Sequence, residues 1–202
     1  MNNTIINIID LTWPIVFISV SVAISLRITY LFKNKKDLSI YKELLMLSFL
    51  IYILCLFQIV TFQDVSWSGS NFIPLKEILR YKIGSNLFIK NVLGNMIMFI
   101  PYGFFVTYFF KYKKIWIPLI LVFIASFSIE VTQLLIGRVF DIDDLILNIL
   151  GGITGYYIYY LIIKFKKKFL RNINFDMLLN LLSIVIIMII LFYLSVLIKG
   201  VF

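Results

Sequence analysis

Four of the ten acidic residues of the chain lie within fifteen positions of an otherwise apolar sequence. Glu130 lies near the end of one apolar run, while Asp141, Asp143 and Asp144 lie at the start of the next. Carboxylates in such positions can accept hydrogen bonds, transfer protons or bind a hard cation. The chain contains no histidine, which removes the commonest general base and any histidine-ligated metal site. The chemistry available here is therefore that of carboxylates and side-chain amides.

Three apolar runs each carry two polar residues three or four positions apart, so that each pair shares one face of a helix. The pairs are Asn91 with Asn95, Glu130 with Gln133, and Asp144 with Asn148. Asp141 precedes Asp144 by three positions and extends the last of these faces, and Arg138 is the nearest cation. We interpret these residues as one candidate site.

The elements that position this site are predicted to be membrane helices. The chain of 202 residues is 62% hydrophobic and only 14% charged, whereas about a quarter of a soluble domain is charged. Runs of about twenty apolar residues are long enough to cross a bilayer as helices. Six such runs are found, at 11–32, 44–62, 89–110, 115–135, 143–163 and 178–198. We predict an all-α, polytopic membrane helical bundle that forms a single integral membrane domain over residues 1–202.

A short amphipathic segment lies between the second and third runs. In PLKEILRYKI (74–83), a helix would place Leu75, Ile78, Leu79 and Ile83 on one face. Pro74 suits the first turn of a helix. This pattern favours a short helix in the membrane interface over a plain solvated loop.

Basic residues predict the orientation of the bundle. The net charge is +9, and twelve of the nineteen basic residues follow the first, third and fifth runs. Because cytoplasmic loops are enriched in Lys and Arg, both termini are expected outside the cytoplasm. This distribution is typical of membrane topology, so no nucleic-acid partner is expected. The N-terminal segment has no basic residue and is read as part of a retained span rather than a cleavable signal peptide.

This topology brings the polar pairs to one depth. The run 89–110 enters from the outer side, 115–135 returns to it, and 143–163 enters again, so each pair lies within roughly 10 Å of the outer end. A helix N-terminus favours carboxylates, so Asp141, Asp143 and Asp144 are candidate caps of the helix that begins there, an explanation that suits Asp143 better than Glu130. The same dipole disfavours Glu130 near a C-terminal end. Glu130 is therefore the strongest functional candidate, whereas Gly151 and Gly155 indicate close helix packing.

The polar residues form an ordered motif. Asn91-x-x-x-Asn95 is followed by FIPYGF, then by IEVTQ and by GRVFDIDDLILNILGGITGY, and NFIPL (71–75) precedes them. In order and spacing these segments, over about 71–156, resemble the VanZ-like family of small membrane proteins. The motif positions are Asn91, Asn95, Pro101, Gly103, Glu130, Gln133, Arg138, Asp141, Asp144, Asn148, Gly151 and Gly155. The resemblance implies a multi-pass protein of the bacterial cytoplasmic membrane, in a family whose founding member is linked to low-level resistance to the glycopeptide teicoplanin.

Two hypotheses give the cluster a ligand. In the first, an outward polar pocket binds or modifies a membrane lipid or a lipid-linked cell-wall precursor, and Arg138 pairs with its phosphate. The ligand-binding residues would be Asn91, Asn95, Glu130, Gln133, Arg138, Asp141, Asp144 and Asn148. In the second, the protein is an enzyme with Glu130, Asp141 and Asp144 as catalytic candidates, which could also gather a divalent ion. No sequence motif for a metal enzyme or for a cofactor accompanies them.

Two further hypotheses need no headgroup. Carboxylates within membranes mark ion or proton paths in transporters, although the inner halves of these three runs are nearly all apolar. Alternatively, the cluster is internal polar glue that fixes the order of the helices. The sequence leaves the oligomeric state open.

Overall fold

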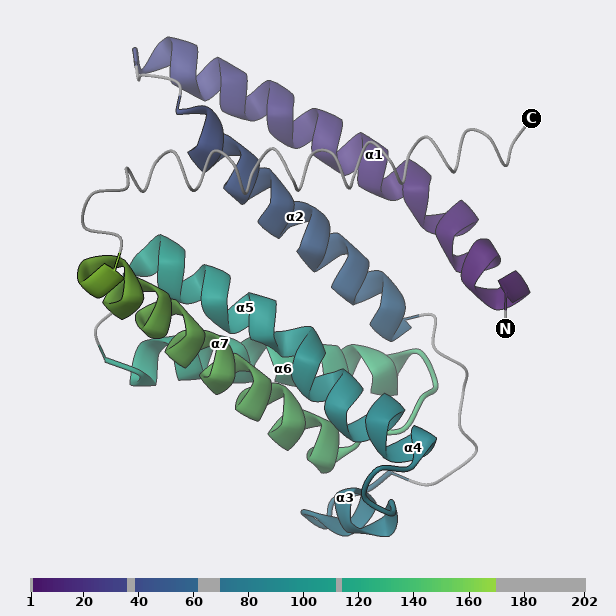
Figure 1. Ribbon diagram of the computed structural model, residues 1–202. Helices are drawn as coiled ribbons and strands as arrows, with labels where there is room; N and C mark the ends of the chain where they lie inside the picture. Colours follow the sequence, from purple (N-terminus) through teal and green to yellow (C-terminus); the bar gives the residue numbers. More distant parts are fainter. Residues whose placement is uncertain (1, 36–38, 62–69, 112–113, 170–202) are drawn as a thin grey trace. The chain divides into compact units, whose positions relative to one another are not determined.

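The computed structural model describes residues 2–35, 39–61, 70–111 and 114–169 (Figure 1). Within these ranges every extended regular element is a helix, and one isolated parallel bridge joins Asn71 to Asp141. The predicted all-α class is confirmed. Contacts divide the chain into two compact units: the described residues up to Leu54 belong to the first, and residues 55–164 form the second. A single domain over 1–202 stays a prediction.

The first unit contains α1 (Asn2–Lys33) and the beginning of α2 (Ile40–Thr61), which carry the first two apolar runs. Arg27 in α1 donates two hydrogen bonds to the carboxylate of Glu43 in α2, with N···O distances of 2.7 and 2.9 Å. This forked ion pair ties the end of one helix to the start of the next. The two helices line a mostly apolar groove of about 610 Å³.

The second unit consists of α5 (Gly94–Phe110), α6 (Trp116–Leu135) and most of α7 (Ile142–Phe169), which lie side by side (Figure 1). The short helix α4 (Asn86–Phe88) and the π-helix η1 (Ile89–Leu93) lead into α5. In the part of the chain that the structure describes, three helices are long and apolar enough to cross a membrane: Asn86–Phe110, Trp116–Leu135 and Ile142–Phe165. They match the third, fourth and fifth predicted runs. The count of six spans stays a prediction, and its last run, 178–198, lies outside the described residues.

Glycines set the close packing of α5 against α7. A Cβ atom added at Gly103, Gly151 or Gly155 would come within 2.0 to 2.1 Å of a backbone oxygen of the opposite helix. At Gly152, an added Cβ would lie 2.5 Å from the side chain of Val122 in α6. The predicted packing role of Gly151 and Gly155 is confirmed, because only residues without a side chain allow backbones to approach this closely.

Gly137 ends α6 and turns the chain back toward α7. Its φ of +84° lies in the left-handed region that favours glycine. The backbone N–H of Gly137 donates to the carbonyl of Leu134, and the N–H of Arg138 donates to that of Gln133. This pair of hydrogen bonds is the Schellman motif, which satisfies the last carbonyl groups of a helix. As a result, only six residues separate α6 from α7.

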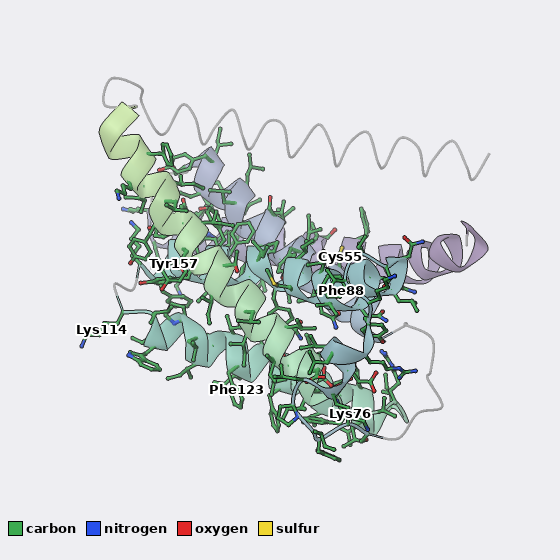
Figure 2. All side chains as sticks on the ribbon, turned by 60° about the horizontal axis from the view of Figure 1, so that its bottom comes forward. Cys55, Lys76, Phe88, Lys114, Phe123 and Tyr157 are labelled. Carbon is green, nitrogen blue, oxygen red and sulfur yellow. The ribbon has the colours of Figure 1, made fainter. Side chains whose placement is uncertain are left out.

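The amphipathic segment forms a shorter helix than predicted. Helix α3 spans only Lys76–Arg80, so Pro74 and Ile83 lie outside it. Tyr81 has an extended backbone, and Gly84 turns the chain at a φ of +81° before α4. The prediction of one helical face over 74–83 is therefore wrong in extent. Figure 2 shows Lys76 of α3 and Lys114, just before α6, at opposite ends of the second unit.

Candidate functional site

The second unit has a polar end, which we define as the start of α5, the end of α6 and the start of α7. Helix α5 runs away from this end, α6 runs toward it and α7 runs away again. Hydrogen bonds between Asn95 and Asp144, and between Glu130 and the backbone of Asp141, show that the three helix ends meet. The convergence expected from the topology is therefore present.

Glu130 points into the bundle and is only 1% exposed. Its Oε2 accepts a hydrogen bond of 3.0 Å from the backbone N–H of Asp141. Asp144, Asp141 and Arg138 lie near enough to act electrostatically on Glu130. The sequence motif has thus placed two carboxylates of neighbouring helices close enough to act on one another.

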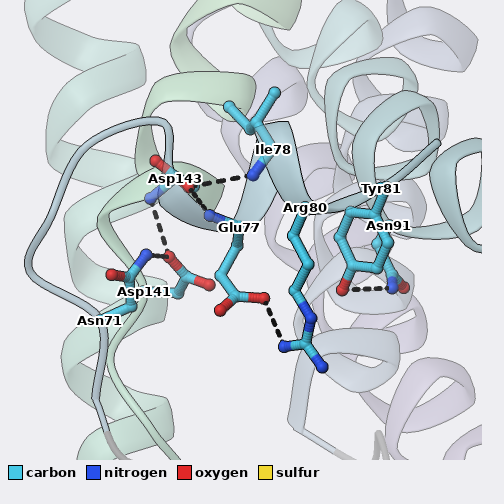
Figure 3. Close-up of polar contacts among 8 residues, drawn as sticks. All are labelled: Asn71, Glu77, Ile78, Arg80, Tyr81, Asn91, Asp141 and Asp143. Atoms are coloured by element: carbon cyan, nitrogen blue, oxygen red, sulfur yellow. Dashed lines mark hydrogen bonds and ion pairs between the residues drawn. The ribbon is translucent and has the colours of Figure 1, made fainter. Parts of the chain in front are cut away.

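The two asparagines at the start of the third predicted run have different partners. Asn95 donates a hydrogen bond through Nδ2 to Oδ1 of Asp144, which joins α5 to α7. Asn91 lies in the π-helix and donates a bond of 2.9 Å to the hydroxyl of Tyr81 (Figure 3). Asn95 therefore belongs to the carboxylate cluster, whereas Asn91 connects α5 to the segment that follows α3. π-helical turns are frequent at functional sites, and the sequence did not predict this one.

Asp141 is the N-terminal cap of α7. Its Oδ1 accepts hydrogen bonds of 2.9 Å from the backbone N–H of Asp143 and from Nδ2 of Asn71. The backbone of Asn71 also bonds to the carbonyl of Phe140 and to the N–H of Ile142. Burial raises the pKa of Asp141, and the hydrogen bonds from Asn71 and Asp143 oppose that shift. Asn71 was missed as a site residue, although NFIPL had drawn attention to its segment.

Asp143 does not cap its own helix, which corrects the prediction made for it. It is 1% exposed, and its carboxylate accepts three hydrogen bonds from the backbone around the start of α3. Figure 3 shows the two from Glu77 and Ile78. The donors are the N–H groups of Leu75 at 2.5 Å, Glu77 at 2.7 Å and Ile78 at 3.2 Å. Asp141 already caps α7, which leaves Asp143 to satisfy the unpaired N–H groups of α3. Those donors lie more than sixty residues upstream, so no local pattern could reveal them.

Asn148 and Ser126 form a polar pair deeper in the bundle. Nδ2 of Asn148 donates a hydrogen bond of 2.9 Å to Oγ of Ser126, and the residues are 5% and 0% exposed. Oδ1 of Asn148 has no hydrogen-bond partner among the described residues. Ser126 was missed because a serine inside an apolar run carries no distinguishing signal.

The two remaining predicted residues lie where α6 ends. Gln133 is 6% exposed, and its backbone carbonyl accepts from the N–H of Arg138. Arg138 is partly buried, and its charge acts on Glu130 and Asp144. Both residues therefore belong to the polar end.

The alternative hypothesis of a divalent-ion site receives no support from the geometry of the described residues. In the described part of the chain, no group of three or more acidic, cysteine or histidine side chains is arranged to hold a metal ion. Asp141 uses Oδ1 to cap α7 and to bind Asn71. A divalent site formed by Glu130, Asp141 and Asp144 together thus has no geometric support.

Three helices of membrane-spanning length that share a buried polar cluster define a helical membrane protein. The family model described as VanZ/LLP1 matches residues 45–164, which include every residue of the cluster. The match covers more than half of the chain, so the chain belongs to the VanZ/LLP1 family. No curated protein and no solved structure matches it.

Proposed function

We propose that this VanZ-family protein protects the cell envelope by binding the headgroup of a lipid-linked envelope component at its polar end, and so contributes to resistance against glycopeptides such as teicoplanin. The carrying observation is the pair of carboxylates at Glu130 and Asp144, on neighbouring helices within a bundle of membrane-spanning length. Ionisable groups inside membrane bundles are costly, and they mark functional sites by default.

Arg138 provides the attraction for a phosphate. A guanidinium group offers a fork of donors that fits phosphate oxygens in pairs. Arg138 is partly buried beside Glu130 and Asp144, so a phosphate would compete with these carboxylates for it. The amides of the polar end would then bind sugar or peptide groups, since amides both donate and accept. These amides belong to Asn91, Asn95, Gln133 and Asn148.

The proposal places the polar end outside the cytoplasm. Lys111 and Lys114 lie at the opposite end of the second unit, as the excess of positive charge on cytoplasmic loops requires. Six spans in the bacterial cytoplasmic membrane would leave both termini outside. Leu79 and Ile83 are 78% and 84% exposed although they lie outside the three candidate spans. This exposure fits a segment that rests in the outer membrane interface.

The hydrogen bonds within the cluster favour one competing role, that of internal polar glue. Asn95 bonds to Asp144, and Glu130 bonds to the backbone of Asp141. A purely structural role for the cluster requires these contacts, but it requires neither a bound ligand nor a contribution to drug resistance. The two roles therefore differ in whether protection can be lost while the fold is kept.

The test is expression of Arg138→Ala in a teicoplanin-susceptible bacterium, with the amount of protein in the membrane measured alongside drug susceptibility. We expect protection to be lost at an unchanged protein level, because the phosphate would have lost its cation. Arg80→Ala is the matched control, since Arg80 is exposed and forms an ion pair of 3.0 Å with Glu77. Full protection by the Arg138 variant would overturn the proposal.

A second measurement addresses the ligand directly. Mass spectrometry of lipids that co-purify with the wild-type chain should detect a phosphate-containing envelope lipid, and Arg138→Ala should retain less of it. Equal lipid content in both preparations would contradict a headgroup site at Arg138.

A further inference from the structure

Asn148 presents a buried oxygen that has no partner. The residue is 5% exposed, and Oδ1 is the only side-chain nitrogen or oxygen atom in the described residues that is buried without a hydrogen-bond partner. Leaving such an acceptor unsatisfied in the interior destabilises the folded state. Its amide nitrogen is already engaged with Ser126. A hydrogen-bond donor or a cation from outside the protein would satisfy this oxygen.

The surroundings of Asn148 are rich in oxygen. Ser126 and Glu130 are four residues apart in α6, as are Asp144 and Asn148 in α7, so each pair shares a helical face. The hydrogen bond from Asn148 to Ser126 shows that these two faces meet. They form two polar layers about 5.4 Å apart, one helical turn: the carboxylates lie in the outer layer, and the amide and hydroxyl groups lie in the inner one.

The column of polar groups ends below the inner layer. One further turn along the helices, Val122 is 1% exposed and packs against Gly152. Phe99 of α5, also 1% exposed, packs against Gly151. These apolar side chains close the column on the far side. Among the described residues, the column of polar groups therefore stops at this level and does not continue as a path through the bundle.

The available atoms define the kind of ligand. Carboxylate, amide and hydroxyl oxygens are the ligands of hard cations. The acidic side chains on these two helical faces are Glu130 and Asp144, while Asp141, whose charge acts on both, uses its Oδ1 to cap α7 and to bind Asn71. The described residues contain no group of three or more acidic side chains of metal-binding geometry. Arg138 already offsets part of the negative charge of Glu130 and Asp144. A small ion of single charge fits this balance better than a divalent ion.

We propose that a sodium ion binds between α6 and α7, coordinated by Oδ1 of Asn148 and Oγ of Ser126 below and by the carboxylates of Glu130 and Asp144 above. The ion satisfies the unpaired oxygen and reduces the repulsion between the two carboxylates. The site shares Glu130, Asp144 and Asn148 with the proposed headgroup site, but sodium binding is measured on purified protein without an envelope lipid, so the two proposals can fail separately.

The test measures thermal unfolding of the full-length protein in detergent while sodium chloride replaces choline chloride at constant ionic strength. A ligand that binds only the folded state raises stability in proportion to the logarithm of its concentration once the site is saturated. The folding constant should then rise about tenfold for each tenfold increase in sodium. Equilibrium dialysis with radioactive sodium should show one ion per chain.

Variants of Asn148 tie the effect to this site. Asn148→Ala should lose the sodium dependence, whereas Asn148→Asp should keep it because an oxygen remains in place. Asn91→Ala is the matched control, since Asn91 bonds to Tyr81 away from the column, and its sodium dependence should equal that of the wild type. If Asn148→Ala does not fold, Ser126→Ala gives the same test, with weaker sodium binding expected.

Two results would overturn the proposal. One is a wild-type protein whose unfolding temperature does not respond to sodium and which binds none in dialysis, in which case water occupies the site. The other is the same sodium dependence in the Asn148→Ala and wild-type proteins, or its loss in Asn148→Asp.

Discussion

Different interactions hold the helices together at the two ends of the α5–α6–α7 bundle. Away from the polar end, Gly103, Gly152 and Gly155 let helix backbones come into direct contact. At the polar end, hydrogen bonds join the helices, and Glu130 is fully buried. Packing of small residues suffices to associate membrane helices. A buried carboxylate adds a desolvation cost that such packing avoids.

This difference indicates which end of the bundle is the better candidate for function. Packing explains the glycines at these contacts, since a Cβ atom at any of them would collide with a neighbouring backbone or side chain. The carboxylates at Glu130 and Asp144 have no such explanation, because asparagine or glutamine could make similar hydrogen bonds without the charge. We therefore propose that the glycine half sets the fold and that the polar end carries the activity.

The largest expected effect lies in the glycine half. Gly103→Val would place a Cβ atom 2.0 Å from the carbonyl oxygen of Gly152, and backbone cannot move aside as a flexible side chain can. We expect a loss of about 3 kcal/mol or more in stability. Thermal unfolding in detergent and the yield of folded protein measure it. Gly94→Ala is the control, because the nearest atom to its Cβ lies at an ordinary 3.7 Å.

If Gly103→Val folds with unchanged stability, the comparison between the two ends fails. The helices would then have room for a side chain at a position where the structure shows direct backbone contact. An equal loss in the Gly94→Ala control would show that the effect does not come from the close contact at Gly103.

Asp143→Ala should have an intermediate effect. It removes the acceptor of three backbone N–H groups, and Leu75 would lose the bond that supports its left-handed backbone, with a φ of 66°. We expect a cost of about 2–3 kcal/mol, since hydrogen bonds to a charged group are among the stronger ones. Hydrogen exchange at Leu75, Glu77 and Ile78 should accelerate.

Glu77→Gln is the matched control for that experiment. Its side chain forms an ion pair with the exposed Arg80, and exposed pairs contribute little. Unchanged exchange at α3 in Asp143→Ala would show that the segment is held by other contacts.

The smallest effect concerns Asp141 and pH. Because burial raises the pKa of Asp141 in the folded state, the folded state holds more protons than the unfolded state between the ordinary and the raised pKa. Its contribution to stability is therefore full below the ordinary pKa and is lost as pH rises through the folded value. Asp141→Asn keeps the Oδ1 acceptor and removes this dependence. Unfolding temperatures of both proteins across acidic pH measure the difference.

With rising pH, the wild type should lose stability relative to Asp141→Asn. A wild type that gains stability relative to the variant would show that the hydrogen bonds from Asn71 and Asp143 outweigh burial.

Much of this arrangement could be predicted from residue spacing. The apolar runs gave three helices of the right position, and alternation of direction brought Asn95, Glu130 and Asp144 to one end. The glycine spacing gave the packing of α7 against α5. These features follow from local periodicity and from the length of a helix that crosses a bilayer.

What could not be predicted depends on contacts between distant segments. Asp143 caps α3, and Asn71 pairs with Asp141 across a separation of 70 residues. The π-helix around Asn91 has no signature in composition. Helix α3 also ends early, because Tyr81 turns to an extended backbone and its hydroxyl accepts from Asn91. Such features are set by tertiary contacts rather than by propensity.

The most direct measurement is teicoplanin susceptibility of cells that express Glu130→Gln at the wild-type level. Glutamine keeps an oxygen for the N–H of Asp141 and removes only the charge, so the variant should fold with stability equal to or above that of the wild type. If the charge of Glu130 serves function, protection falls while the protein remains abundant and folded. Undiminished protection by this variant would contradict the assignment of activity to the polar end.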